Sequence, residues 1–162
     1  PNGDDTRILD KKPTGNQTWF LALKGLSGTS CKLFFNVDFT GDDYEATSTN
    51  TDISLYQWNH VVITYNRSSA SNQASIFVNG VREGVGHTTP TLIRKDDSAL
   101  DLTVGAQLSA ASGGSPLEVF EGFIDEVRIY NRILTSGSAS VDAVAGGEIK
   151  KNYKHGKSKH KN

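Results

Sequence analysis

Asp125 is the acidic residue that most needs a partner. It lies in the run GFIDEVRIY, and strand alternation places its side chain on the same face as Phe123 and Val127. An unpaired carboxylate among apolar side chains is costly, so Asp125 requires a bound cation or hydrogen bonds from loop amides or an arginine. Carboxylate oxygens are ligands that Ca²⁺ accepts, which makes a structural calcium ion one candidate partner.

Other possible metal ligands are less specific. The acidic pairs Asp42-Asp43 and Asp96-Asp97 could add oxygen ligands, and we predict Asp96 and Asp97 as secondary metal ligands. The alternative is that adjacent acids in loops are solvated turn formers. The four histidines and the single cysteine have no zinc-like spacing, which argues against a transition-metal site.

Aromatic and amide side chains could recognise a carbohydrate. A sugar needs an aromatic face for its C–H side and planar polar groups for its hydroxyls. Phe34, Asn36 and Asp38 share the non-core face of one predicted strand, and other candidates lie near strand ends. We predict these ligand-binding residues: Trp19, Asn36, Asp38, Tyr44 and Asn79. In the alternative interpretation Trp19 completes the core and Phe34 is an isolated exposed apolar residue, while Trp58 is predicted to be core.

The elements that must position these residues are strands. Short β-branched and aromatic runs alternate with Gly, Asn, Asp and Ser clusters, a pattern typical of a sandwich. Asn79-Gly80 lies between two such runs and predicts a type I′ hairpin. Alternation assigns Leu33, Phe35, Val37 and Phe39 to the core, together with Val127 and Ile129. We predict strands at 6–10, 18–23, 32–39, 44–49, 60–65, 74–78, 81–85, 101–104 and 122–130.

Three Gly-, Ser- and Ala-rich stretches predict surface loops, where recognition usually resides. They lie at 66–73, 108–116 and 135–147. A short C-terminal helix is predicted at 147–154, since Ile149 and Tyr153 are spaced to face the sandwich together.

Composition places the chain among single-domain proteins. Its 162 residues can bury a sizeable core without disulfides, and the only cysteine, Cys31, is predicted to be a small buried hydrophobe. No run is long and apolar enough to insert in a membrane. Six lysines and no acid in residues 149–162 make the end of the chain basic, but without arginines or interleaved aromatics we expect a solvated tail and no nucleic-acid partner.

Three stretches resemble the signature of the laminin-G-like, concanavalin A-like superfamily. They are YQWNHVVITYN, SIFVNGVREG, and LTVGAQ followed by EGFIDEVRIYNRIL, which together cover residues 56 to 134. RILDK and TWFLAL extend the resemblance toward the start of the chain. The resemblance implies an all-β, concanavalin A-like jelly-roll sandwich of two antiparallel sheets. Many domains that resemble this one hold a structural ion near the Asp of the Ile-Asp-Glu-Val strand, which again indicates Asp125 as a calcium ligand.

Some relatives with this fold are glycoside hydrolases or lyases. Retaining glucanases of the fold place acids at i, i+2 and i+4 of one strand, with two carboxylates about 5 Å apart. The nearest run here is Glu121, Phe123 and Asp125, which lacks the middle acid. A lyase would need a base and a positive group, for which the imaginable residues are His60, Tyr65 and Arg67. Because this histidine lies in a segment that is usually structural, we expect no catalysis.

The start of the chain departs from the family pattern. Two or three strands precede the one at Arg7 in such domains, and with no Met in the chain we expect a processed or truncated piece. The missing strands would leave sheet edges open, so we expect either upstream sequence or homo-oligomers that pair through these edges. The ending EIKKNYKHGKSKHKN resembles C-termini of structural proteins from tailed phages of marine bacteria.

We therefore predict a laminin-G-like sandwich domain at residues 1–154 and a basic tail at 155–162. Its expected function is non-catalytic binding of a carbohydrate or a surface protein, outside the cell or on a virion surface. The alternative is a structural domain that joins subunits without a small ligand.

Overall fold

The computed structural model describes residues 6–11, 18–27, 29–41, 43–49, 53–69, 73–85, 93–109 and 114–134. All regular secondary structure in these ranges is β-strand, and every strand pair is antiparallel. The predicted all-β class is therefore confirmed. The predicted helix at 147–154, the loop at 135–147 and the basic tail lie outside the described residues. The described part of the chain has no helix that could span a membrane.

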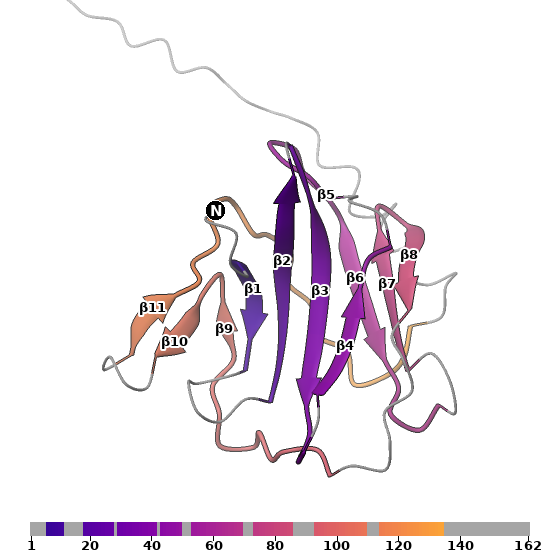
Figure 1. The fold of residues 1–162 in the computed structure, drawn as a ribbon, viewed down its shortest axis with the longest axis vertical. Coiled ribbons are helices and arrows are strands. Elements are labelled where there is room, and N and C mark those ends of the chain that lie inside the picture. Colours follow the sequence, from indigo (N-terminus) through magenta and orange to yellow (C-terminus); the bar gives the residue numbers. More distant parts are fainter. Residues whose placement is uncertain are drawn as a thin grey trace, which may run out of the picture.

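The larger sheet has six strands in the order β4-β3-β2-β1-β9, with β5 paired to the start of β3 (Figure 1). β2 and β3 are nine residues each and form its centre. The strand bounds are β1 Thr6–Asp10, β2 Trp19–Ser27, β3 Ser30–Asp38, β4 Asp43–Thr47, β5 Ile53–Ser54 and β9 Thr103–Val104.

The smaller sheet has three strands in the order β6-β7-β8, and Figure 1 shows it behind the larger sheet. Its strands are β6 Val61–Tyr65, β7 Ala74–Val78 and β8 Val81–Val85. Asn79 and Gly80 join β7 to β8 with φ angles of 49° and 82°, which confirms the predicted hairpin with two positive-φ residues. A separate ribbon of β10 (Gln107–Ser109) and β11 (Ser115–Leu117) occupies part of the segment that was predicted to be a loop.

The core lies between the two sheets. The four residues of β3 and its end that were predicted to be core are all buried, and they pack with buried residues of β7 such as Ile76. Cys31 is also buried there, as predicted, and burial raises the pKa of its thiol. Alternation along β3 thus identified the inner face of the larger sheet correctly.

The sheets meet closely along one side, where β4 lies against β8. Gly84 packs so near the end of β4 that a Cβ atom would come within 2.6 Å of the carbonyl oxygen of Thr47. The backbone N–H of Thr49 also donates to the carbonyl of Glu83 across this seam, at 2.7 Å. Only a glycine fits at position 84, so the sandwich is closed along the β4–β8 side.

Tyr44 also links the two sheets. Its hydroxyl oxygen accepts a 2.8 Å hydrogen bond from the backbone N–H of Ala74 in β7, and its ring lies 5.4 Å from that of Tyr65. Burial raises the pKa of Tyr44 to about 12, so its phenol stays neutral through the physiological range. Because Ala74 is fully buried, its backbone N–H needs an acceptor within the protein, and the Tyr44 hydroxyl takes the place of a carbonyl from a neighbouring strand.

The opposite side of the sandwich is open. Among the described strands β6 pairs with β7 alone, and the inner faces of β2 and β1 extend beyond it. A cavity of about 1480 Å³ lies between β6 and these strands, and residues 118–134 line it. Figure 1 shows this last segment crossing behind the larger sheet.

The prediction of a strand at 122–130 is wrong for this structure. Glu126 has a left-handed φ of 53°, and its N–H is capped at 2.8 Å by the carboxylate of Asp125, which interrupts the extended backbone. Val127 and Ile129, predicted to be core, are exposed. Trp58 was also predicted to be core, but it is 68% exposed where it lines the cavity. Val127, Ile129 and Trp58 would need a neighbouring strand to cover them, and no described strand lies against them.

Tyr44→Phe should lower the free energy of unfolding by about 1–3 kcal/mol, because the buried N–H of Ala74 loses its acceptor. The matched control is Tyr65→Phe. The Tyr65 hydroxyl is buried without a hydrogen-bond partner in the described structure, so its removal should change stability by less than about 0.5 kcal/mol. Urea denaturation of the two variants measures both values. Equal losses for the two would contradict the bridging role of Tyr44.

Candidate functional site

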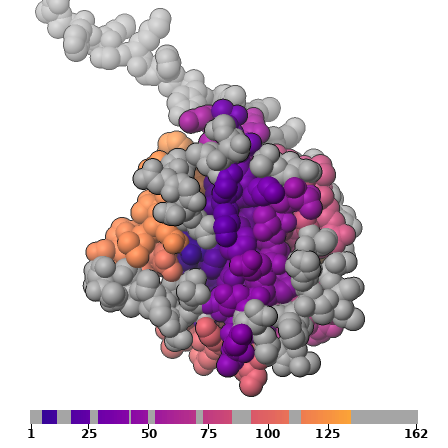
Figure 2. All heavy atoms as spheres, in the orientation of Figure 1, coloured from indigo at the N-terminus to yellow at the C-terminus, as the bar shows by residue number. Residues whose placement is uncertain are grey.

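The outer face of the larger sheet carries a set of polar side chains in register. Cross-strand pairing aligns Asp10 with Phe20, Phe20 with Asn36, and Asn36 with Glu45. Residues directly opposite in antiparallel strands share a face, so these four side chains form one row. The neighbouring row consists of Arg7, Ala22, Phe34 and Thr47. In Figure 2 the atoms of β2, β3 and β4 occupy the middle of this face.

Asn36 and Asp38, two predicted ligand-binding residues, lie together on this outer face and are buried. Asn36 is only 3% exposed, and its side-chain oxygen has no hydrogen-bond partner in the described structure. Asp38, two positions along β3, is fully buried. A buried amide oxygen without a partner costs roughly 1–3 kcal/mol, and this oxygen is closed to solvent in the structure.

Arg7 is the buried cation of this face. Its guanidinium Nε forms an ion pair with Glu118 and lies 3.3 Å from the carboxylate of Asp10. The guanidinium also stacks 3.4 Å from the centroid of the Phe20 ring. A cation on an aromatic face gains electrostatic stabilisation from the ring, and the two acids offset the cost of burying the charge. Arg7 thus joins β1, β2 and the segment after β11.

The second aromatic ring of the face is covered in the same way. The ammonium group of Lys24 lies 4.1 Å from the centroid of the Phe34 ring. Both phenyl rings are therefore occupied on one face by a cation, and neither is an open platform for a sugar. The hydrogen-bonding groups of this face that are open to solvent include those of Lys24 and Glu45, whereas Arg7, Asn36 and Asp38 are buried.

The other three predicted ligand-binding residues lie elsewhere. Trp19 projects toward the inner side of the larger sheet, and Tyr44 is the core bridge between the sheets. Asn79 stabilises the β7–β8 hairpin, where its side-chain oxygen accepts from the N–H of His60 at 2.9 Å. The structure thus brings together two of the five residues. It separates Trp19 and Tyr44 from them because they have the opposite parity in their strands.

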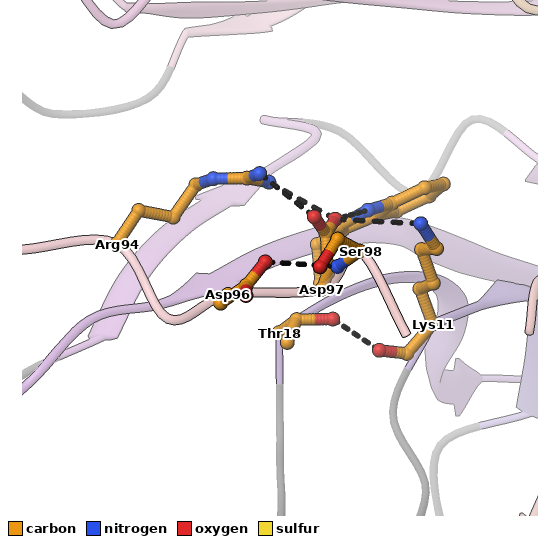
Figure 3. Close-up of polar contacts among 7 residues, drawn as sticks. Lys11, Thr18, Arg94, Asp96, Asp97 and Ser98 are labelled. Carbon is orange, nitrogen blue, oxygen red and sulfur yellow. Dashed lines mark hydrogen bonds and ion pairs between the residues drawn. The ribbon is translucent and has the colours of Figure 1, made fainter. Parts of the chain in front are cut away.

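Asp97 lies at the centre of a polar cluster beside the start of β2 (Figure 3). We call this cluster the clasp, and it consists of Lys11, Trp19, Arg94 and Asp97. Its two oxygens accept from the guanidinium of Arg94 at 2.8 and 3.1 Å, and one of them also accepts from the indole N–H of Trp19 at 3.2 Å. The ammonium of Lys11 lies 3.7 Å away. Burial alone raises the pKa of Asp97, but the hydrogen bonds of Arg94 and the charges of Arg94 and Lys11 hold it below its ordinary value. Asp97 is thus engaged by cations.

The structure does not gather the predicted calcium ligands Asp96, Asp97 and Asp125 into one group. Both oxygens of Asp97 face cations, and Asp96 accepts the backbone N–H of Ser98 at 2.9 Å. Asp125 is exposed and accepts the N–H of Glu126. The residues described contain no group of three acids, histidines or cysteines that could hold a metal ion. Calcium binding stays a prediction.

Several residues of the face escaped the sequence analysis. Arg7, Asp10, Phe20 and Lys24 belong to strands whose alternation was visible, but a β-bulge between Arg7 and Leu9 shifts the register of β1. A bulge reverses which residues share a face, so the pattern of β1 alone could not assign Arg7 and Asp10 to the same side. Alternation in β2 could have placed Phe20 on this face, because it lies between the inward-facing Trp19 and Leu21.

Comparison with known proteins supplies one match. The family model described as the concanavalin A-like lectin/glucanases superfamily matches residues 1–139. No curated protein and no solved structure matches the chain significantly.

Asp97→Asn should lower the free energy of unfolding by about 2 kcal/mol at neutral pH, because hydrogen bonds to charged groups are worth about 1.5–3 kcal/mol. The folded-state pKa is lowered, so the contribution of Asp97 is present above its ordinary pKa of 3.8 and is lost as pH falls through the folded-state value. The loss on mutation should therefore shrink in acid. Denaturation at pH 7 and pH 2.5 measures it, with exposed Asp101→Asn as the control; a pH-independent loss would contradict the ionic clasp.

Thermal melts in millimolar calcium and in chelator should give the same Tm. An ion held by the folded chain alone would raise Tm in proportion to the logarithm of its concentration. A Tm that rises with calcium, and not with magnesium, would show that the chain does hold an ion through a ligand set other than the one described above.

Proposed function

Because the chain belongs to the concanavalin A-like lectin/glucanase superfamily, we propose that it is a non-catalytic carbohydrate-binding module whose site is the outer face of the larger sheet. The domain is compatible with such a role, since lectins give the superfamily half of its name. The observation that carries the proposal is a row of polar groups on this face, in which Asn36, whose side-chain oxygen has no partner among the described residues, lies between Phe20 and the exposed Glu45.

The chemistry of this face suits a polyhydroxylated ligand. A sugar hydroxyl both donates and accepts, and this face carries both kinds of group: Asn36 and Glu45 lie in one row, and Lys24 and Lys32 lie two rows away along the same strands. Hydrogen bonds that involve charged groups are the stronger ones, so acids and lysines around a neutral amide favour polar ligands. Affinity would come from these bonds, since the rings are covered by cations.

Absence of catalysis is part of the proposal. The acids with the nearest glucanase-like spacing, Glu121 and Asp125, are exposed on a segment that is not a strand. Glycoside hydrolysis needs two carboxyl groups held across one cleft at a fixed separation. An exposed carboxylate that caps a backbone amide and an unpaired second acid do not supply that arrangement.

The second candidate is an assembly role in which the ligand is a surface protein or another subunit. The observation that favours it is the free edge of β6, because an unpaired strand edge is a template for pairing with another chain. An extracellular or virion-surface setting suits either role. We expect neither nucleic acid nor membrane as a partner.

Asn36→Ala should weaken carbohydrate binding. The side-chain oxygen that it removes has no partner among the described residues, so a purely structural role of Asn36 predicts no loss of binding in the folded variant. A printed glycan array followed by calorimetry with the best-bound glycan measures the effect, and we expect at least about a tenfold loss of affinity, the equivalent of one hydrogen bond.

The control is Asn79→Gly. Glycine tolerates the positive φ at this position, and the residue lies in the hairpin of the smaller sheet, so binding should be retained. Silence of the wild-type domain on the array, together with reversible association in light scattering, would favour the assembly role. Binding that survives Asn36→Ala would place the site away from this face.

A further inference from the structure

We propose that Asn66 is an acceptor for an N-linked glycan, presented on the turn that follows β6. The chain contains two Asn-x-Ser/Thr triplets whose middle residue is not proline, Asn16-Gln17-Thr18 and Asn66-Arg67-Ser68. This triplet is the acceptor pattern for N-glycosylation on surface loops of secreted proteins. The proposal rests on the extracellular setting proposed above, and it does not depend on the carbohydrate-binding face of the larger sheet.

The turn that carries Asn66 is held by hydrogen bonds on both sides. The N–H of Ser69 donates to the carbonyl of Asn66 at 3.1 Å, which closes the turn, and the N–H of Asn66 donates to the carbonyl of Gln73 at 2.7 Å. The side-chain amide of the buried Gln73 in turn donates to the carbonyl of Arg67 at 2.9 Å. These bonds keep the second triplet in one conformation at the end of β6.

The side chain of Asn66 uses its oxygen within the turn and leaves its nitrogen available. Its Oδ1 accepts a 3.0 Å hydrogen bond from the backbone N–H of Ser68, which is the geometry of an Asx turn. Its Nδ2, the atom to which an N-linked glycan is attached, makes no hydrogen bond to any described residue. A glycan bonded to Nδ2 would therefore displace no contact of the described structure.

The rest of the triplet is open to solvent. Arg67 and Ser68 are exposed, and Asn66 is partly exposed. The Ser68 hydroxyl makes no hydrogen bond to the described part of the chain. A transferase has to reach both the amide nitrogen and the hydroxyl two residues later, and a glycan is bulky enough to require a surface position. The second triplet meets both requirements.

The first triplet differs at its hydroxyl residue. Thr18 is fully buried, and its hydroxyl donates to the carbonyl of Lys11. Its own carbonyl accepts a 2.8 Å hydrogen bond from the N–H of Asp38 in the larger sheet. Asn16 and Gln17 lie outside the described residues. Because the Thr18 hydroxyl is enclosed by the fold, the folded domain favours modification at Asn66.

The modification is a group transfer that needs one co-substrate, an oligosaccharide carried on a lipid pyrophosphate. The Nδ2 of Asn66 forms a bond to the anomeric carbon of the oligosaccharide and loses one proton. The bond between that carbon and the pyrophosphate oxygen breaks, and its electron pair leaves with the lipid pyrophosphate. The step involves no oxidation or reduction.

Secretion of the full chain from cultured animal cells tests the proposal. Electrophoresis before and after treatment with an amidase that releases N-linked glycans should show a single downward step. The amidase converts a glycosylated asparagine to aspartate, so mass spectrometry should find aspartate at position 66. Asn66→Gln and Ser68→Ala should both abolish the step, whereas Ser68→Thr, which keeps the hydroxyl, and Asn16→Gln should retain it.

Two results would overturn the proposal: a secreted wild-type chain that the amidase leaves unchanged, and a step that survives Asn66→Gln. Ser68→Ala keeps the backbone N–H that closes the Asx turn, so secretion at the wild-type level shows that this variant is folded. Binding to a glycan array by the unmodified domain, produced in bacteria that lack the lipid-linked donor, tests the proposed function separately. Failure of one proposal is thus distinguished from failure of the other.

Discussion

The fold depends on one constraint: two sheets of unequal width share a single apolar interface. Along the β4–β8 side the constraint is met by contact, through Gly84 against the backbone of β4 and the hydroxyl of Tyr44 on Ala74. Along the β6 side the wider sheet has no opposite strand and leaves a cavity. Residues 118–134 and the exposed Trp58 line this cavity on the open side.

The same asymmetry separates the functions of the two faces of the larger sheet. Its inner face is apolar and serves packing, as the burial of Leu33 and Phe35 shows. On its outer face the rings of Phe20 and Phe34 each contact a cation. Acids, an amide and basic residues lie around these rings, and several of them are buried. Buried polar groups on a sheet face usually have partners that satisfy them, and within the described part of the chain the side-chain oxygen of Asn36 has none.

Sequence reasoning recovered what local rules govern. Alternation predicted the inner face of β3, and the Asn-Gly step predicted the hairpin, because both depend on residues close together in the chain. It grouped Trp19 and Tyr44 with Asn36, but in the structure these two residues lie on the opposite face of the larger sheet. Which residues of neighbouring strands share a face depends on the register of the strands. It could not see that Arg7 would stack on Phe20, since a bulge sets the facing of β1. Asp97 was predicted to be a metal ligand because the fold alone brings Lys11 to it, and because the ion pair with Arg94, three residues earlier, depends on the local conformation of the loop.

Arg7 connects the outer face of the larger sheet to the segment after β11, because its guanidinium contacts Phe20 and Asp10 on one side and Glu118 on the other. A buried cation with two acids and an aromatic ring around it is costly to leave without any one of them. This single side chain therefore fixes the position of residue 118 relative to the first two strands.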